Sequence, residues 1–549
     1  MGALALLAVL FNMAVIWQFP PALDRGQTYF LWPLIANVAH GTGYVACNPS
    51  YFLNCESTNQ VTAMYEPVPV LVFAALAALT HDSLWVVAGF QALVAVVTLV
   101  GLAMLTRQLA GPRTALVAGA IWAVYLPALR LVPEAAADLL GALGATCGVL
   151  AFMHARRTDR KVAWAVAGVA IGLGTLSRSA VLVLALTLVA GLLLWERSPA
   201  GRGLSWRLQR SLLVLAACAV VQVPWLVRNE LAFGRPILGS TLVGYNLLRE
   251  AHALTTPDYA RRVSVNEGVA ALHEVAARRP DLNGSENEGQ LDTVYREEAL
   301  SIIAAHPLRY VVSTADRMFM LWFNSRASGS EAGGASLADA MAYLPNVQQV
   351  LILAAAVVGF AVSSWHTSWP LVLTLVVYCL AHMAVGTQQR YLVPVMPLVI
   401  ALAAVGWAHA VERLRRPAFS VAGDAPWLAL VRRFGRLEQE TYALYLAARN
   451  PRATWSAFSA VVAGVVLSLE PLPNPVKSLP ALDRVIDVAP MLFGISVARR
   501  LLPPAKLRSY RAEAQGALAA HQRRPLLVCA VAWVAVATLT LVLLIWNPV

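Results

Sequence analysis

The chain has 549 residues, of which 58% are hydrophobic and only 13% are charged. An average soluble domain carries about a quarter charged residues, so this composition excludes an ordinary soluble enzyme. It indicates a protein that is largely surrounded by lipid. The net charge of +12 does not indicate a nucleic-acid partner, because arginines that fix membrane topology beside anionic lipid account for it.

Apolar stretches recur along the chain at lengths that suit membrane spans, each of which needs about 20 largely apolar residues. The pattern therefore predicts an all-α polytopic membrane protein with about 11 transmembrane helices. The predicted spans are residues 2–19, 84–106, 114–133, 135–153, 162–177, 180–195, 211–227, 349–364, 369–386, 391–410 and 525–546.

The loops between these spans alternate between arginine-rich and arginine-poor. The positive-inside rule places the arginine-rich loops in the cytoplasm. We therefore expect two long arginine-poor regions, residues 20–83 and 228–346, to face the exterior. Residues 67–79 are a span or an interfacial helix, and only the interfacial interpretation keeps every arginine-rich loop inside. Those loops are residues 107–113, 154–161, 196–210 and 411–416.

Two of the six cysteines, Cys47 and Cys55, fall in the first external region. An oxidising compartment on that side favours a disulfide between them, and two free thiols are the alternative. The other cysteines lie in apolar stretches, where they are most simply packing residues.

Carboxylates gather at the predicted external face. Asp24 directly follows the first span, and Glu66 directly precedes residues 67–79. Glu134 and Asp138 lie one turn apart at the mouth of an apolar helix, where ionisable groups are costly and usually functional. Each of the four could also be an ordinary acid at a helix end, and the residues alone leave this open.

Lone arginines stand near these carboxylates in the arginine-poor segments, namely Arg130, Arg178 and Arg390. Each could neutralise one carboxylate. Together they would suit a phosphate, because a guanidinium binds phosphate oxygens through two parallel hydrogen bonds. The sequence contains no nucleotide-binding glycine loop and no histidine cluster for a metal, and it leaves the use of a divalent cation open.

Several short motifs follow one another in a fixed order over residues 1–412. After the acid at position 24 they are ANVAHGTGY, YEPVP, PEAAADLL, TLSRSA, PWLVRNELAFGRPILGSTLVGYNLL, NEGQLDTVYREEALSIIAAHPLRY and QQRYLVPVMPL. In this order they resemble the GT-C membrane glycosyltransferases, in the broad bacterial group related to protein mannosyltransferases and the aminoarabinose transferase of lipid A.

The resemblance implies a GT-C-like helical bundle with interfacial helices and a mixed external loop domain, in the bacterial inner membrane. It also implies inverting transfer of a sugar from a polyprenyl-phosphate donor to an envelope acceptor at the external face. No nucleotide site is needed, because the sugar arrives already activated on lipid.

The resemblance also assigns roles to residues. Asp24 would be the general base, with Glu66 and Glu134 positioning substrates or assisting it, and with Tyr29 and Asp138 in support. The lipid phosphate would be held by Arg178, Arg228 and Arg390. The chain departs from the family pattern at Arg25, where many relatives carry a second acid, and at Gln389, where a glutamate is expected.

The C-terminal part differs in character, with more charge and proline over residues 417–523. Residues 442–511 resemble the YkvA-like family of unknown function, which implies a helical module in the cytoplasm or against the membrane and no activity. The matching pieces are YALYLAARNPRATW, SLEPLPNPVKSLPALDRVID and ARRLLPPAKLRSYRAEA.

Two other functions compete with the transferase. Charges at membrane depth also mark transport routes, but the chain shows no internal repeat, and a secondary transporter does not need the long external region 228–346. A catalytically silent scaffold of an envelope assembly is the second alternative, and the Asp24–Arg25 departure keeps it open.

Overall fold

The computed structural model describes residues 2–55, 60–196, 203–256, 265–282, 284–323, 337–386 and 388–415, with residues 509 and 512. The described residues are helix, turn or loop, apart from one isolated β-bridge between Val45 and Val61. The chain divides into two compact units, residues 1–356 with 366–408 and residues 357–365 with 409–549. Nearly all described helices belong to the first unit.

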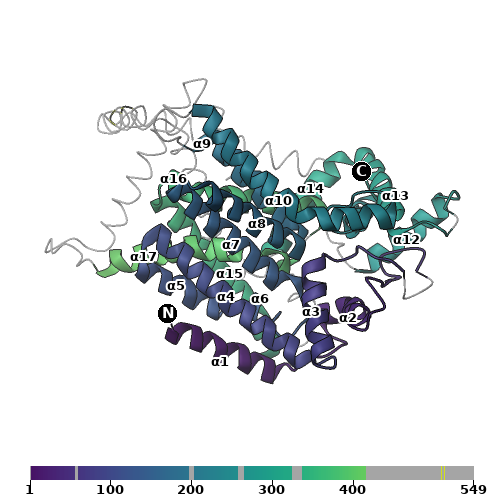
Figure 1. Ribbon diagram of the computed structural model, residues 1–549, viewed down its shortest axis with the longest axis horizontal. Helices are drawn as coiled ribbons and strands as arrows, with labels where there is room; N and C mark the ends of the chain where they lie inside the picture. Colours follow the sequence, from purple (N-terminus) through teal and green to yellow (C-terminus); the bar gives the residue numbers. More distant parts are fainter. Residues whose placement is uncertain are drawn as a thin grey trace. The chain divides into compact units, whose positions relative to one another are not determined.

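Within the described residues the prediction of an all-α protein is confirmed (Figure 1). The helices are α1 Gly2–Gln18, α2 Gly26–Ala39, α3 Pro67–Leu79, α4 Leu84–Ala110, α5 Pro112–Ala123, α6 Leu126–Leu129, α7 Ala137–Thr158, α8 Lys161–Ser177, α9 Leu182–Trp195, α10 Gly203–Phe233, α11 Leu242–His252, α12 Val265–Arg278, α13 Glu288–Ala305, α14 Pro307–Trp322, α15 Leu337–Val362, α16 Trp365–Val385 and α17 Met396–Arg415, with 3-10 turns η1 Ser179–Val181, η2 Ala253–Thr255 and η4 Gln389–Leu392.

Five of these helices are long and apolar enough to cross a membrane, namely α4, α7, α10, α16 and the Leu344–Val362 part of α15. This makes the chain a multi-pass membrane protein. Five further apolar helices are shorter, among them α1, α3 and α8. The count of eleven spans therefore stays a prediction. The predicted last span, 525–546, and nearly all of the predicted module 417–523 lie outside the described residues.

The predicted span 114–133 is not one helix, because α5 ends at Ala123. Pro127 has no N–H, and its ring would clash with the carbonyl of residue 123 in a continuous helix. Backbone freed in this way needs other partners in an apolar setting. The Gln348 side chain supplies them, accepting from Leu126 N at 2.9 Å and donating to Val124 O at 2.8 Å.

Close packing of α8 against α7 and α10 fixes the end of α8 in space. A Cβ added to Gly144 of α7 would collide with the backbone of Gly174 in α8. A Cβ added to Gly168 of α8 would collide with the carbonyl oxygen of Val214 in α10. Small residues allow this close backbone approach between membrane helices, and Arg178 directly follows the helix that they hold.

The region that we predict to be external contains a separate apolar core. Helices α11, α12 and α13 pack together there, and the Phe52 and Met64 side chains of the first predicted external region join the same core. The described parts of the two predicted external regions thus share one apolar core. Its buried members also include Tyr245, Leu248, Ala251, Leu254, Ala271, Leu272, Val275, Leu291, Val294, Tyr295, Ala299 and Ile302.

Candidate functional site

The Glu134 carboxylate caps the N-terminus of α2. The Gln27 backbone N–H donates to Glu134 Oε2 at 2.8 Å, and Ala135 N donates to Thr28 Oγ1 at 3.0 Å. Unpaired amides and the helix dipole favour a negative charge at this end of a helix. The residues that follow Asp24 in the chain are therefore tied to the loop before α7.

Burial makes the Glu134 carboxyl harder to ionise than a carboxyl in water. Burial raises the pKa of the Glu134 carboxyl above its ordinary value, and the Gln27 amide and the Arg390 guanidinium offset only part of the rise. Glu134 thus holds a proton at a higher pH than a surface glutamate does.

Gly26 is the residue that makes the Glu134 contact feasible. Its φ is +51°, and a Cβ there would collide with the Glu134 carboxyl group. We expect Gly26→Ala to displace Glu134 and destabilise the protein by about 1–3 kcal/mol. Unfolding by SDS titration in mixed micelles measures this, with Gly41→Ala (φ +79°, open space around the Cβ) as the control. A Gly26→Ala effect no larger than the Gly41→Ala effect would contradict the contact.

Asp138 and Arg178 form an ion pair beneath the surface, with Arg178 Nη2 at 3.5 Å from Asp138 Oδ1. Asp138 is fully buried, and neither of its oxygens accepts a hydrogen bond from the described residues. Glu66, also buried, accepts a hydrogen bond from Ser179 N at 2.8 Å. The first turn of α7 and the start of α3 thus meet at the junction between α8 and η1.

Removing Arg178 would leave a buried carboxylate without its partner. Loss of one partner of a buried pair costs about 3–5 kcal/mol, so we expect Arg178→Ala to lower the free energy of unfolding by about 3 kcal/mol. The double variant Arg178→Ala/Asp138→Asn should recover part of that loss. If the double variant is as unstable as Arg178→Ala in the same SDS titration, the ion pair is not the cause.

Tyr391 joins Arg178 to Arg390. The two guanidinium carbons lie 4.9 and 5.1 Å from the centre of its ring. Arg390 Nε donates to Gln388 Oε1 at 2.8 Å, whereas Arg390 Nη1 is buried and has no hydrogen-bond partner among the described residues. A buried guanidinium nitrogen without an acceptor is suited to an oxygen of a bound anion.

Gln389, the residue where a glutamate is expected, points elsewhere. Its side-chain amide donates to Trp322 O at 3.4 Å. Gln389 therefore brings no charge beside Arg390, and its side chain contacts α14.

Asp24 lies outside this cluster, in the turn between α1 and α2. It is exposed and makes no side-chain hydrogen bond or ion pair with the residues that the structure describes. Tyr29 is 59% exposed and packs edge-on against Phe30. The chain links Asp24 to the site through Gly26 and Gln27, which contact Glu134.

Arg228 has a different setting, because α10 continues past the predicted end of the span at 227. Its guanidinium stacks on Tyr44 and Trp225, each at 5.1 Å, and on Phe233 at 5.5 Å. It also donates to Asn229 Oδ1 at 2.9 Å and to Tyr44 O at 3.3 Å. The structure therefore unites Glu66, Glu134, Asp138, Arg178 and Arg390. Aromatic rings surround the guanidinium of Arg228.

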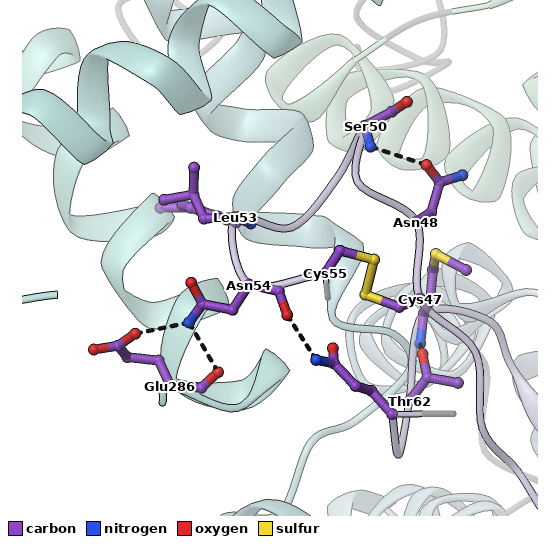
Figure 2. The surroundings of a disulfide bond; sticks show 11 residues. Cys47, Asn48, Ser50, Leu53, Asn54, Cys55, Thr62 and Glu286 are labelled. Carbon is purple, nitrogen blue, oxygen red and sulfur yellow. Dashed lines mark hydrogen bonds between the residues drawn. A yellow bond between two sulfur atoms is a disulfide. The ribbon is translucent and has the colours of Figure 1, made fainter. Parts of the chain in front are cut away.

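Cys47 and Cys55 are joined by a disulfide with a Cα–Cα distance of 5.6 Å. Figure 2 shows this loop against the second predicted external region, where Asn54 Nδ2 donates to the Glu286 backbone oxygen and to its carboxylate. Leu53 N also donates to Tyr295 Oη at 3.1 Å. The disulfide-bridged loop is thus fastened to α13 and to the residues before it.

Sequence reasoning missed several residues of this arrangement. Tyr391 adjoins Arg390 in the QQRY motif, and Gly26 follows Asp24–Arg25, so position in the motifs was the available signal. Among the described residues, no group of three or more His, Cys, Asp and Glu side chains is placed to hold a metal ion.

Residues 65–227 match a family model, which covers Glu66, Glu134, Asp138 and Arg178. The segment matches the dolichyl-phosphate-mannose-protein mannosyltransferases. Asp24 and Arg390 lie outside this mannosyltransferase-like segment. No curated protein matches the chain.

The chain is similar to several solved structures. One is the archaeal oligosaccharyltransferase AglB of Archaeoglobus fulgidus in complex with an inhibitory peptide and a dolichol-phosphate. The identity is 14%, the TM-score is 0.46, and the match covers 89% of this chain and 55% of that one. For the apo form of the oligosaccharyltransferase from the same organism the identity is 13% and the TM-score is 0.46, and the match covers 89% of this chain and 56% of that one. The chain spans about half the length of these distant structures.

Proposed function

We propose that the chain is an inverting glycosyltransferase that moves a sugar from a polyprenyl-phosphate donor to an envelope acceptor. The match of residues 65–227 to the mannosyltransferase family supports the class of donor. The observation that carries the proposal is the pair Arg178 and Arg390 on the Tyr391 ring, with Arg390 Nη1 unpaired.

In the proposed reaction an acceptor hydroxyl attacks the anomeric carbon from the side opposite the phosphate. Asp24 takes the hydroxyl proton, because it is exposed and no described residue occupies its carboxylate. A placed base of this kind contributes about 10²–10⁴-fold to the rate. The bond from the anomeric carbon to the phosphate oxygen breaks, and its electron pair leaves with polyprenyl phosphate.

Arg178 and Arg390 stabilise the charge that grows on the departing phosphate. Such preorganised donors act most strongly where they need no reorganisation during the reaction. Asp138 and Glu66 hold Arg178 and the following residue in place. Glu134 fixes the start of α2 and with it the chain beside Asp24.

A panel of radiolabelled polyprenyl-phosphate sugars, incubated with purified full-length protein in nanodiscs, tests the proposal. We expect release of polyprenyl phosphate from at least one donor. The same reaction in the presence of EDTA determines whether a divalent cation is required. Binding of no donor and release from none would contradict the proposal and favour a transporter or a scaffold. Transport of a labelled solute into proteoliposomes would favour the transporter.

A further inference from the structure

Glu288, the first residue of α13, holds two separate segments of the chain together. Its Oε2 accepts from Ala63 N at 2.9 Å and from Thr241 Oγ1 at 2.8 Å. The two segments are also bonded to each other, since Thr241 N donates to Ala63 O at 3.0 Å. Glu288 is only 5% exposed, and Ala63 and Thr241 are fully buried.

Both segments reach the residue next to Arg178. Three residues beyond Ala63, Glu66 accepts a hydrogen bond from Ser179 N. Two residues before Thr241, Gly239 lies so close to Ser179 that a Cβ there would be 2.7 Å from Ser179 Cβ. Two series of contacts therefore run from Glu288 to the end of α8, where Arg178 lies.

The start of α13, which carries Glu288, is stabilised by its own capping residues. Asn287 and Gln290 form a capping box, in which each side chain accepts from the backbone N–H of the other. The first turn of α13 is thereby fixed around Glu288. Ala63 belongs to a buried apolar cluster with Trp225, Phe233 and Ile237.

We propose that Glu288 is a positioning residue for the transferase, which aligns Arg178 through residues 63–66 and 239–241. This inference rests on the proposed function. Catalytic sites tolerate little misplacement, since a shift of about 1 Å can cost 10²-fold in rate. Glu288 touches neither donor nor acceptor in this scheme and acts only by holding the two segments.

The stability that Glu288 contributes to the fold depends on pH. Burial raises the pKa of Glu288 to about 7, although the Thr62, Ala63 and Thr241 donors and the Arg228 guanidinium lower it. The groups facing it are Arg228 and the phenols of Tyr44 and Tyr295. Because the pKa is raised in the folded protein, the proton stabilises the fold, and this stability is lost as pH rises from about 4.5 to about 7.

Three substitutions separate positioning from bulk stability. Glu288→Gln keeps an oxygen that accepts from both donors, Glu288→Asp keeps the charge but shortens the reach, and Glu288→Ala removes both bonds. Glu297→Ala is the matched control, because Glu297 is on the same helix and its side chain is 61% exposed. Turnover of the best donor gives kcat and KM, and hydrogen exchange reports on residues 60–66 and 178–181.

We expect Glu288→Ala and Glu288→Asp to lower kcat about ten-fold or more with a smaller change in donor KM, and to speed exchange in both peptides. Glu288→Gln should retain kcat, protect both peptides and abolish the fall in melting temperature between pH 4.5 and 7. Faster exchange confined to residues 60–66, with kcat unchanged, would overturn the proposal.

The exchange measurement also separates this inference from the proposed function. If wild-type protein turns over no donor, the function fails. Faster exchange at residues 178–181 in Glu288→Ala would then still establish the coupling, and unchanged exchange there would refute it.

Discussion

Replacing Asp24 by Asn is expected to lower the rate of sugar transfer by about 10²–10⁴-fold. The amide keeps the shape of the side chain but cannot accept the acceptor's proton. Donor affinity should change little, because Asp24 is exposed in the turn before α2. Among the described residues it makes no hydrogen bond or ion pair with Arg178 or Arg390, the proposed phosphate ligands. Single-turnover release of radiolabelled sugar measures the rate, and equilibrium binding of the same donor measures the affinity.

Asp281→Asn is the control for this substitution, because Asp281 is another exposed acid in the predicted external region, with its side chain 58% exposed. Wild-type turnover in Asp24→Asn would refute the role of Asp24 as base. Glu134→Gln would then be the next variant, since Glu134 is the carboxyl that contacts the residues directly after Asp24 and Arg25.

Replacing Arg390 by Ala is expected to lower kcat/KM for the donor by about 10²–10³-fold. The proposed phosphate oxygen loses its donor, the buried Nη1 of Arg390, while the Arg178–Asp138 pair stays intact. Arg390→Lys should restore only part of the rate, because an ammonium is a point charge and lacks the planar fork of the guanidinium.

Arg130→Ala provides the comparison for Arg390→Ala. Arg130 is exposed at the end of α6 and was an equal candidate in the sequence. Equal losses in the two variants would indicate a general effect of external positive charge. Such a result would contradict a specific phosphate site.

The sequence predicted the helices well wherever one local property decides. Apolar length and flanking arginines located α4, α7, α8 and α16. The break at Ala123 was missed, because residues 124–133 remain mostly apolar and only Pro127 signals the end of the helix.

The site was less accessible to sequence reasoning, because its contacts join distant residues. Asp138 and Arg178 were each singled out, yet nothing local indicates that Gln27 binds Glu134 or that Glu288 binds Ala63. Arg228 is a further example. The resemblance implies that it holds the lipid phosphate, and nothing local in the sequence indicates that its guanidinium contacts Tyr44, Trp225 and Phe233.

Equilibrium binding of polyprenyl phosphate and of unphosphorylated polyprenol of equal length, in nanodiscs, tests the central claim most directly. Wild-type protein and Arg130→Ala should bind the phosphate at least about ten-fold more tightly than the alcohol, a difference of about 1.4 kcal/mol. Arg390→Ala should lose most of that preference while its affinity for polyprenol stays unchanged. Equal binding of the two lipids by wild-type protein, or an undiminished preference in Arg390→Ala, would contradict a phosphate site formed by Arg178 and Arg390.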